Sequence, residues 1–395
     1  MEIGNLTNSR AACTHGEQQA PAGRITSAER VRRVLNFEKP DYVPLYDVYW
    51  GGFLNAWRRE RCLPPRSDVP IDDVVLDDTD MLDYYHIDLF QVAPDEQPWP
   101  SRQAVLEQQG GYILERDGWG RLLRRRSTSP YGEPLENRLT TKGQLDTLNF
   151  EPACLSARYS GMMASIDKAG RLIHLPYVFI KIGGPFLRSS FLRGEYQWYL
   201  DIASDLAFAS DLADRVTDFL IDVGVEAIRR SQLGGSSIWI FDDVASNRGL
   251  LISPTTYERL FLPRLQRMVA AFKAEGVEHV GFHSDGDIRA IVEGLLDAGI
   301  TILNPLEPRA NMDPVTIRRR YGQRAALVGG LCNSLILPDG SDADVRTHVE
   351  RVLSVAQEGG LVLGAHSIGP DIAVDRYDSL MKILCEYGRP APGRS

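Results

Sequence analysis

Two histidines and one aspartate have the residue types and the setting of a metal site. His283 and Asp285 lie in Phe-His-Ser-Asp-Gly (282–286), just after an apolar run, and residues two apart in an extended backbone point the same way. His366 follows another apolar run, in Gly-Ala-His-Ser-Ile-Gly-Pro (364–370). Two imidazoles and a carboxylate can bind Zn²⁺ or Fe²⁺ and leave positions for water or substrate. The alternative is structural: Asp285 caps His283, and His366 lies at the surface or the edge of the core.

Acidic residues end two further apolar runs. Glu307, in Asn-Pro-Leu-Glu-Pro (304–308), is a candidate catalytic base or additional metal ligand, or else a charge at the start of a helix. Asp243 is the second catalytic candidate, and with Arg248 it would position the substrate. The alternative for Asp242 and Asp243 is a helix N-cap or an ion pair with Arg248.

Aromatic and small residues complete the expected site. Trp50 ends an aromatic run and is expected to form a flat wall for a planar substrate, with core packing as the alternative. Gly183 ends another run and is expected beside the substrate. We assign Cys332 to packing rather than to metal binding.

Eight short apolar runs precede these residues, and helical patterns separate most of them. The runs cover 43–50, 87–93, 175–182, 238–241, 279–282, 300–303, 325–328 and 361–363, and the main helical patterns cover 200–232, 257–274, 288–298, 314–321 and 342–357. Apolar strands between helices are typical of a parallel sheet covered on both faces, and eight of them favour an α/β fold, the closed (β/α)₈ TIM barrel. The carboxyl ends of barrel strands meet at one rim, which would bring His283, Asp285 and His366 together. No Gly-rich dinucleotide or P-loop motif is present.

The domain organisation follows from where this pattern starts and stops. Residues 1–24 are polar and without periodicity, which predicts a disordered N-terminal tail, and residues 25–390 are predicted to form a single barrel domain. Residues 94–148 break the pattern. There, short runs at 112–115 and 121–125 flank a Gly-Trp-Gly turn, which indicates a hairpin insertion.

Composition excludes several classes of partner. The 395 residues carry a formal net charge of −9 without a basic stripe, so we expect a small-molecule substrate and no nucleic-acid or membrane partner. No apolar run approaches the roughly 18 residues of a membrane span, and the first 25 residues lack a signal-peptide core. Five scattered cysteines without a C-x-x-C pair fit a cytoplasmic protein. Whether the chain forms a homodimer stays open.

Several segments, taken in order, resemble the uroporphyrinogen decarboxylase (URO-D) superfamily between about residues 27 and 388. They are the opening helix and strand at 29–44, Gly-Gly-Pro-Phe-Leu-Arg at 183–188, the stretch from Asp-Asp-Val to Ile-Ser-Pro at 242–254, His-Ser-Asp-Gly-Asp at 283–287, Asn-Pro-Leu-Glu-Pro at 304–308, Leu-Val-Gly-Gly at 327–330 and His-Ser-Ile-Gly-Pro at 366–370. The resemblance implies a TIM barrel.

The chain departs from the decarboxylases of this superfamily. Their arginine-bearing stretch after the first strand is replaced by Val-Tyr-Trp-Gly-Gly-Phe-Leu-Asn (48–55), so a substrate with many carboxylates would lack counter-charges. Two positions still match: Asp95 looks like the substrate-binding aspartate, and His366 looks like the histidine of Gly-His-Gly. A metal-free decarboxylase, with Asp95 on a pyrrole-like nitrogen and His366 stabilising developing charge, is therefore one alternative.

The zinc-dependent methyltransferases of the superfamily give the favoured prediction. Their pattern, His-x-Cys and a late Cys, falls on His283, Asp285 and His366 here, so both thiolates are replaced by other ligand types. Such a site suits an ether, methoxy or carboxylate substrate better than a thiol. The resemblance implies a metal-dependent methyltransferase or O-demethylase that uses zinc, with iron as the alternative. It would move a methyl group from a small methylated compound to a corrinoid protein. A non-catalytic barrel that only binds a ligand or corrinoid protein is a further alternative.

Overall fold

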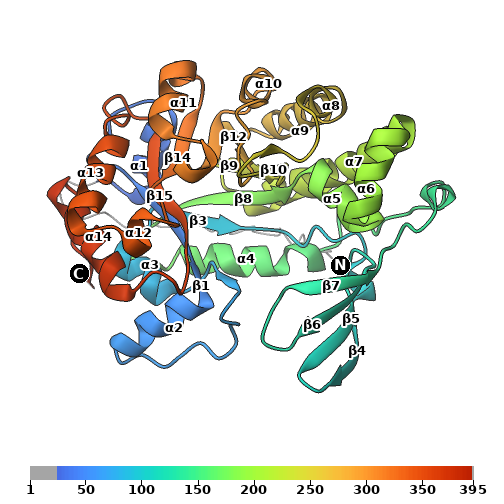
Figure 1. The fold of residues 1–395 in the computed structure, drawn as a ribbon, viewed down its shortest axis with the longest axis horizontal. Coiled ribbons are helices and arrows are strands. Elements are labelled where there is room, and N and C mark those ends of the chain that lie inside the picture. Colours follow the sequence, from blue (N-terminus) through green and yellow to red (C-terminus); the bar gives the residue numbers. More distant parts are fainter. Residues whose placement is uncertain (1–24, 394–395) are drawn as a thin grey trace, which may run out of the picture.

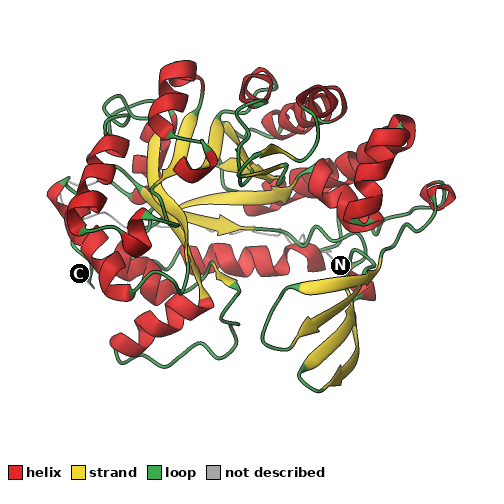
Figure 2. Cartoon of the chain, in the orientation of Figure 1, coloured by secondary structure: helices red, strands yellow, loops and turns green. Residues whose placement is uncertain are grey.

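A curled sheet of eight parallel strands forms the centre of the molecule, and helices pack around it (Figures 1 and 2). The computed structural model describes residues 25–393, so the tail predicted for residues 1–24 lies outside the described residues. The order of the strands is β3 (Leu89–Val92), β8 (Tyr177–Gly183), β9 (Ser237–Phe241), β12 (His279–His283), β13 (Ile302–Leu306), β14 (Ala326–Gly330), β15 (Leu361–Ile368) and β1 (Leu45–Trp50), with the two-residue β2 (Val74–Val75) antiparallel to β1. These eight strands match the eight apolar runs, and the predicted (β/α)₈ barrel is confirmed.

The barrel closes between β1 and β3 at their amino-terminal ends. Asp88, just before β3, donates its backbone N–H to the Leu45 carbonyl and accepts the Leu45 N–H on its carboxylate, both at 2.9 Å. The same carboxylate binds Arg30 at 2.9 Å and Arg389 at 2.8 Å. Asp88 is fully buried, and the two guanidinium groups outweigh burial and lower its pKa. The Asp88 carboxylate thus links β1 and β3 to Arg30 near the start of the described chain and to Arg389 near its end.

The barrel interior is filled by side chains in close contact. Phe179 and Trp239 stack with ring centroids 4.0 Å apart, and Tyr46 meets both rings edge-on. Gly281 makes this possible, because a Cβ there would lie 2.7 Å from the Trp239 ring. The interior is therefore a solid core, and ligands have access only from its ends.

The helices cover the outside of the sheet. They are α1 (Ser27–Leu35), α2 (Gly51–Glu60), α3 (Thr79–Tyr85), α4 (Ala157–Ala169), α5 (Pro185–Arg193), α6 (Glu195–Ser204), α7 (Leu206–Ser231), α8 (Pro254–Leu260), α9 (Leu262–Ala274), α10 (Val292–Asp297), α11 (Pro314–Tyr321), α12 (Ile336–Asp339), α13 (Asp342–Leu353) and α14 (Val374–Glu386). Two predicted helices are each divided in two. Asp205 ends α6 and caps α7 by accepting the Phe208 N–H, and Pro263 restarts the chain in the first turn of α9.

The insertion is larger than the predicted hairpin. The predicted pair, β5 (Tyr112–Arg116) and β6 (Leu122–Arg126), is present, and β4 (Ala104–Gln109) and β7 (Gly132–Glu136) extend it to a four-stranded antiparallel sheet (Figure 1). Short 3₁₀ turns flank this sheet at Pro100–Arg102 and Lys142–Leu145. Trp119, in the predicted turn, is buried and meets Phe191 of α5 edge-on at 5.5 Å, so the sheet is anchored to the barrel.

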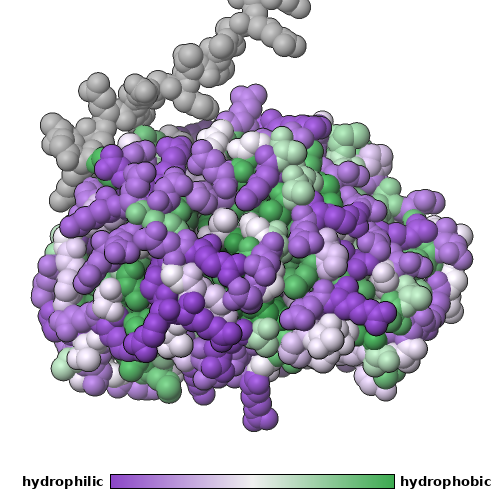
Figure 3. Space-filling view, turned by 90° about the horizontal axis from the view of Figure 1, so that it is seen from above, coloured by the Kyte–Doolittle hydropathy of each residue, from purple (hydrophilic) through white to green (hydrophobic). Residues whose placement is uncertain are grey.

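The remaining short elements lie near the barrel rim. The hairpin β10 (Ala245–Ser246) and β11 (Gly249–Leu250) follows β9, and 3₁₀ turns cover Pro308–Ala310 and Gly322–Arg324. Seen from above, hydrophilic side chains dominate the described surface and hydrophobic ones show between them (Figure 3). Within residues 25–393, no helix combines the length and the apolar character that crossing a membrane requires.

Candidate metal centre

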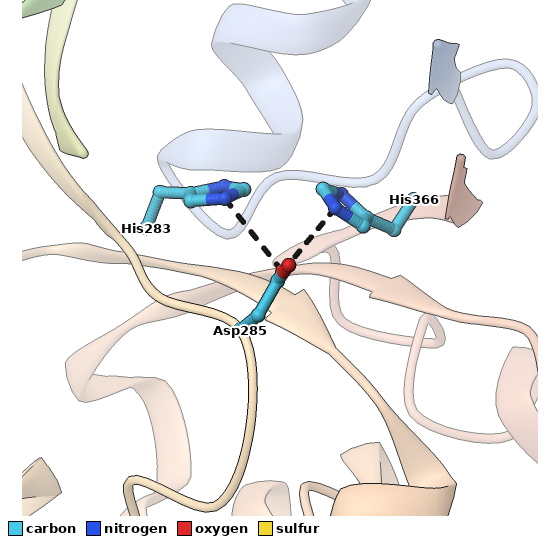
Figure 4. Close-up of side chains that lie close together, drawn as sticks. All are labelled: His283, Asp285 and His366. Atoms are coloured by element: carbon cyan, nitrogen blue, oxygen red, sulfur yellow. Dashed lines mark ion pairs between the residues drawn. The ribbon is translucent and has the colours of Figure 1, made fainter. Parts of the chain in front are cut away.

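His283, Asp285 and His366 converge at the carboxyl-terminal rim of the barrel. His283 ends β12, Asp285 follows two residues later, and His366 lies in β15; the carboxylate of Asp285 lies between the two rings (Figure 4). Its Oδ1 is 3.7 Å from Nε2 of His283 and 3.3 Å from Nε2 of His366. One donor atom from each residue lies within 4.8 Å of the other two.

Asn304 fixes the orientation of His283. The Asn304 Oδ1 atom on neighbouring β13 is 2.6 Å from Nδ1 of His283. An amide oxygen only accepts, so Nδ1 carries the proton and the lone pair of Nε2 points toward Asp285. Phe241 stacks on the other side of the site at 4.0 Å from the His283 ring. Burial, followed by the charge of His366, lowers the pKa of His283 and keeps the ring neutral, the form that binds metals.

A bulge in β15 aims His366 into the cluster. Leu45 pairs with Leu363 and Asp47 pairs with His366, so β15 holds one extra residue between these pairs. His366 itself has a left-handed backbone with φ of 67°. The buried Asp47 carboxylate accepts the Ala365 N–H at 2.5 Å and the Tyr377 hydroxyl at 2.8 Å. Backbone strain held by such a network is typical of functional sites.

The charges of the cluster favour an ionised pair between His366 and Asp285. Burial opposes a charge on His366, but the hydrogen bond to Asp285 and the charges of Asp285, Glu307 and Asp243 raise the pKa of His366. Burial likewise opposes the charge of Asp285, while the hydrogen bond from His366 and the charges of both histidines lower its pKa. Nδ1 of His366 is buried and has no hydrogen-bond partner among the described residues.

This donor set fits a divalent ion. Imidazole and carboxylate donors at about 2.0–2.2 Å from zinc lie roughly 3.3 Å apart in a tetrahedral site. The Asp285 Oδ1 atom lies 3.3 Å and 3.7 Å from the two imidazole nitrogens, close to that spacing. The fixed tautomer of His283 also leaves its Nε2 lone pair free. The protein residues present can therefore hold zinc or iron through two nitrogens and one oxygen.

Two further acids shape the turn that carries Asp285. Asp243 Oδ1 accepts the Asp285 N–H at 3.1 Å and lies 4.0 Å from Nε2 of His283. Glu307 Oε2 accepts the Gly286 N–H at 2.9 Å. Burial, more than any other cause, raises the pKa of both Asp243 and Glu307. Both acids thus lie next to the cluster with an increased affinity for a proton.

Asp242 takes a different position from Asp243. Its fully buried carboxylate accepts the backbone N–H groups of Phe186 and Leu187 at 3.1 and 2.7 Å, at the amino end of α5. Gly184 allows this approach, since a Cβ there would lie 2.2 Å from the Cβ of Asp242. Asp242 therefore binds the amino end of α5, in agreement with the structural alternative of a helix-capping role.

Four other predicted residues lie around the rim but outside the cluster. Asp95 lines a cavity of about 420 Å³ between α4 and α5, and no residue of the cluster lines that cavity. Gly183 donates its N–H to Glu96 at 2.5 Å. Trp50 lines a cavity of about 360 Å³ together with Ser367, the residue that follows His366 in β15. Arg248 is exposed in the turn between β10 and β11, and within the described part of the chain its side chain forms no ion pair.

Residues that the sequence analysis did not single out also shape the site. Asn304 orients His283, Asp47 supports the bulge, and Lys181 reaches the ring of Phe241 from β8, with its Nζ 4.5 Å from the ring centroid. Asp47 and Lys181 are polar residues inside apolar runs, and Asn304 directly follows one; these positions are the signal that could have identified the three residues.

Comparisons with known proteins agree with this architecture. The family model for uroporphyrinogen decarboxylase (URO-D) matches residues 176–387, and no curated protein matches the sequence. Among solved structures, a methyltransferase from Methanosarcina mazei superposes with a TM-score of 0.64 at 14% identity, covering 93% of this chain and all (100%) of that one. A B12-independent methionine synthase from Shewanella sp. W3-18-1, in complex with selenomethionine, gives a TM-score of 0.37 at 11% identity, over 72% of this chain and 73% of that one.

The likeness to the Methanosarcina protein shows a shared fold, over nearly the whole of both chains. The family match covers more than half of the 395 residues, including all three residues of the cluster. The expected resemblance is therefore confirmed, and the chain belongs to the uroporphyrinogen decarboxylase (URO-D) family.

Proposed function

We propose that this protein is a metal-dependent methyltransferase that removes a methyl group from a small methoxylated compound and passes it to a corrinoid protein. The observation that carries the proposal is the cluster of His283, Asp285 and His366 at the rim where barrel enzymes bind their substrates. A hydrogen bond from Asn304 and a bulge in β15 hold the two imidazoles in place. Zinc is the proposed ion, and iron(II) is the alternative for a two-histidine, one-carboxylate set.

The ligand types indicate the kind of substrate. A divalent ion held without thiolates is a hard Lewis acid, and when bound it would polarise an ether or carboxyl oxygen. In O-demethylation the methyl–oxygen bond breaks, the methyl group goes to the acceptor, and the oxygen keeps the electron pair and takes a proton. Glu307 is suited to supply that proton because burial raises its pKa and it lies beside the cluster. Asp243 and Arg248 would position the substrate against Trp50.

A metal-free decarboxylase has less support. It would require Asp95 and His366 to act on one substrate, but Asp95 lines a cavity to which His366 does not contribute. The arginines that could hold extra carboxylates are already paired: Arg188 binds Glu96 at 2.5 Å, and Arg193 binds Asp201 at 2.6 Å. Neither Arg188 nor Arg193 is therefore free to bind the carboxylates of a polyanionic substrate.

Metal analysis of the purified protein tests the proposal. We expect one tightly bound equivalent of metal in the wild type, and its loss in both His283→Ala and His366→Ala. The matched control is His279→Ala, because His279 begins the same strand β12 at the opposite end from His283 and should not affect the metal. Retention of the metal in both cluster variants would rule out the site.

The reaction itself is tested with the metal-loaded protein. Methoxylated compounds are supplied with free cob(I)alamin as acceptor, and methyl transfer is followed by the change in corrinoid absorbance. Turnover that disappears in His283→Ala but not in His279→Ala supports the proposal. Release of carbon dioxide from a porphyrinogen by metal-free protein would instead establish the decarboxylase.

A further inference from the structure

Lys181 brings a positive charge into the barrel mouth. It lies in β8, in Tyr-Val-Phe-Ile-Lys-Ile-Gly (177–183), where the other residues are apolar or glycine. Residues two apart in a strand point the same way, so Lys181 shares its side of the sheet with Phe179, which belongs to the barrel interior. The side chain is mostly buried, and burial lowers the pKa of the amine.

Among the residues that the structure describes, no acidic side chain pairs with this amine. Within the described residues, Lys181 has no hydrogen bond and no ion pair, and its recorded contact is the face of the Phe241 ring, 4.5 Å from Nζ to the ring centroid. The nearby Arg188, by contrast, has a counter-charge, because it forms an ion pair with Glu96 at 2.5 Å. Glu96 and Asp243 act on Lys181 only through longer-range electrostatics. A partly buried amine at the barrel mouth that has no counter-charge of its own is available to an anionic ligand.

The ring of Phe241 links Lys181 to the metal centre. Phe241 lies on β9, between β8 and β12, and its ring is stacked on His283 at 4.0 Å between centroids with an interplanar angle of 11°. Lys181 contacts the same ring from the β8 side. The free amine and the nearer metal ligand are thus separated by a single aromatic ring. That separation suits a substrate with one group at each end of a small planar body.

We propose that Lys181 binds the carboxylate of the substrate, an aromatic carboxylate whose methoxy group reaches His283, Asp285 and His366. This inference rests on the proposed function, since it names the substrate class of the same site. The unpaired amine of Lys181 matches one anionic group of the substrate, while Asp243, Asp285 and Glu307 nearby would repel a ligand with several negative charges. Trp50 is partly exposed at the mouth and offers aromatic surface for the planar body.

Binding of a matched pair of probes tests the assignment. We use 4-methoxybenzoate and the neutral 4-methoxybenzamide, measured by titration calorimetry with the wild type, Lys181→Met, Lys181→Arg and the control Lys382→Met. Lys382 is exposed on α14. We expect Lys181→Met to bind the carboxylate at least tenfold more weakly and the amide unchanged. Lys181→Arg should retain most of the affinity, and Lys382→Met should match the wild type.

Thermal stability separates a binding role from a structural one. Lys181→Met removes a partly buried charge that has no ion-pair partner within residues 25–393, so we expect its Tm without ligand to equal or exceed that of the wild type. The carboxylate should raise the Tm of the wild type and not that of Lys181→Met. A large drop in the Tm of Lys181→Met would show that the lysine stabilises the fold, and would overturn the proposal. Equal binding of the two probes by wild type, or no binding of either, would do the same.

The test of the Lys181 site can fail or succeed independently of the proposed methyltransferase function. The titrations are repeated with His283→Ala, in which the metal site is removed but Lys181 is kept. If no protein sample binds zinc while carboxylate binding still depends on Lys181, the proposed function fails and the anion site stands. If zinc binds as expected but Lys181→Met does not weaken carboxylate binding, the anion site fails alone.

Discussion

The amide oxygen of Asn304 accepts a hydrogen bond from Nδ1 of His283 at 2.6 Å, across two neighbouring parallel strands. His283 and Asn304 are directly opposite each other in the β12–β13 pairing. The contact decides which nitrogen of the imidazole carries the proton, and it leaves Nε2 free on the side of Asp285. Asn304 is not one of the proposed metal ligands, yet its hydrogen bond holds the ligand His283 in the tautomer that can bind a metal.

Replacing Asn304 should weaken metal binding without removing a ligand. In Asn304→Leu, His283 loses its acceptor, so its ring can rotate or change tautomer, and we expect zinc affinity to fall roughly 10- to 100-fold. Asn304→Asp keeps an oxygen acceptor and should retain most of the affinity. Competition with a chromogenic chelator measures both. Equal zinc affinity in wild type and Asn304→Leu would show that the hydrogen bond does not orient His283 for binding.

Zinc binding should depend on pH through His366 rather than through His283. The pKa of His366 is raised above its ordinary 6.5, so at any pH below this raised pKa the metal must displace a proton from His366. The pKa of His283 is lowered, and no proton has to leave its Nε2. We expect no more than one proton to be released per zinc, and the affinity for zinc to rise with pH until His366 is neutral.

Calorimetry in buffers with different ionisation enthalpies counts the released protons. The count should fall toward zero at a pH above the raised pKa of His366. Two protons per zinc at pH 7 would contradict the assignment of a neutral His283.

Asp88 should contribute strongly to stability at neutral pH. Its carboxylate lies between Arg30 and Arg389, and Asp88→Asn would leave both guanidinium groups buried without a full counter-charge. We expect the free energy of unfolding to fall by roughly 3–5 kcal/mol, the range for a broken buried ion pair. Urea denaturation at pH 7 measures the change. Asp41→Asn is the control, since Asp41 also pairs with Arg30 but is partly exposed, and its effect should be much smaller.

The same carboxylate predicts a loss of stability in acid. Because the pKa of Asp88 in the folded protein lies below its ordinary 3.8, its contribution is complete above about pH 4 and is lost as pH falls through the folded value. The stability of Asp88→Asn should therefore depend less on pH in this range than that of the wild type. An unchanged acid limb in the variant would show that other carboxylates dominate it.

The strands were predictable because the barrel buries them on both sides. All eight apolar runs correspond to strands, but β13 and β15 extend beyond the runs that predicted them. They continue through Asn304 and His366, where polar residues interrupt the apolar pattern at the very positions that face the site. The ends of the apolar runs thus indicated where the rim lies. They did not predict how far the strands that form the rim extend.

Long-range pairing determines what the sequence could not predict. The bulge that turns His366 depends on which residue of β1 lies opposite it, and the role of Asn304 depends on its register with His283. Neither relation leaves a local signal. Strand β4 of the insertion is exposed along its whole length, so it lacks the apolar alternation by which strands are recognised.

Replacing Glu307 should show whether it transfers a proton in the reaction or binds the metal. Glu307→Gln keeps an oxygen that can accept the Gly286 N–H, so the turn after β12 is held as in the wild type. If Glu307 transfers a proton, turnover should fall 10²- to 10⁴-fold while zinc affinity stays unchanged. The wild-type rate should also fall as pH rises through the raised pKa of the glutamic acid, because only the protonated form can donate. Zinc content and turnover are measured in parallel in Glu307→Gln. Loss of both would show that Glu307 is a fourth metal ligand. Full activity would show that Glu307 takes no part in the reaction.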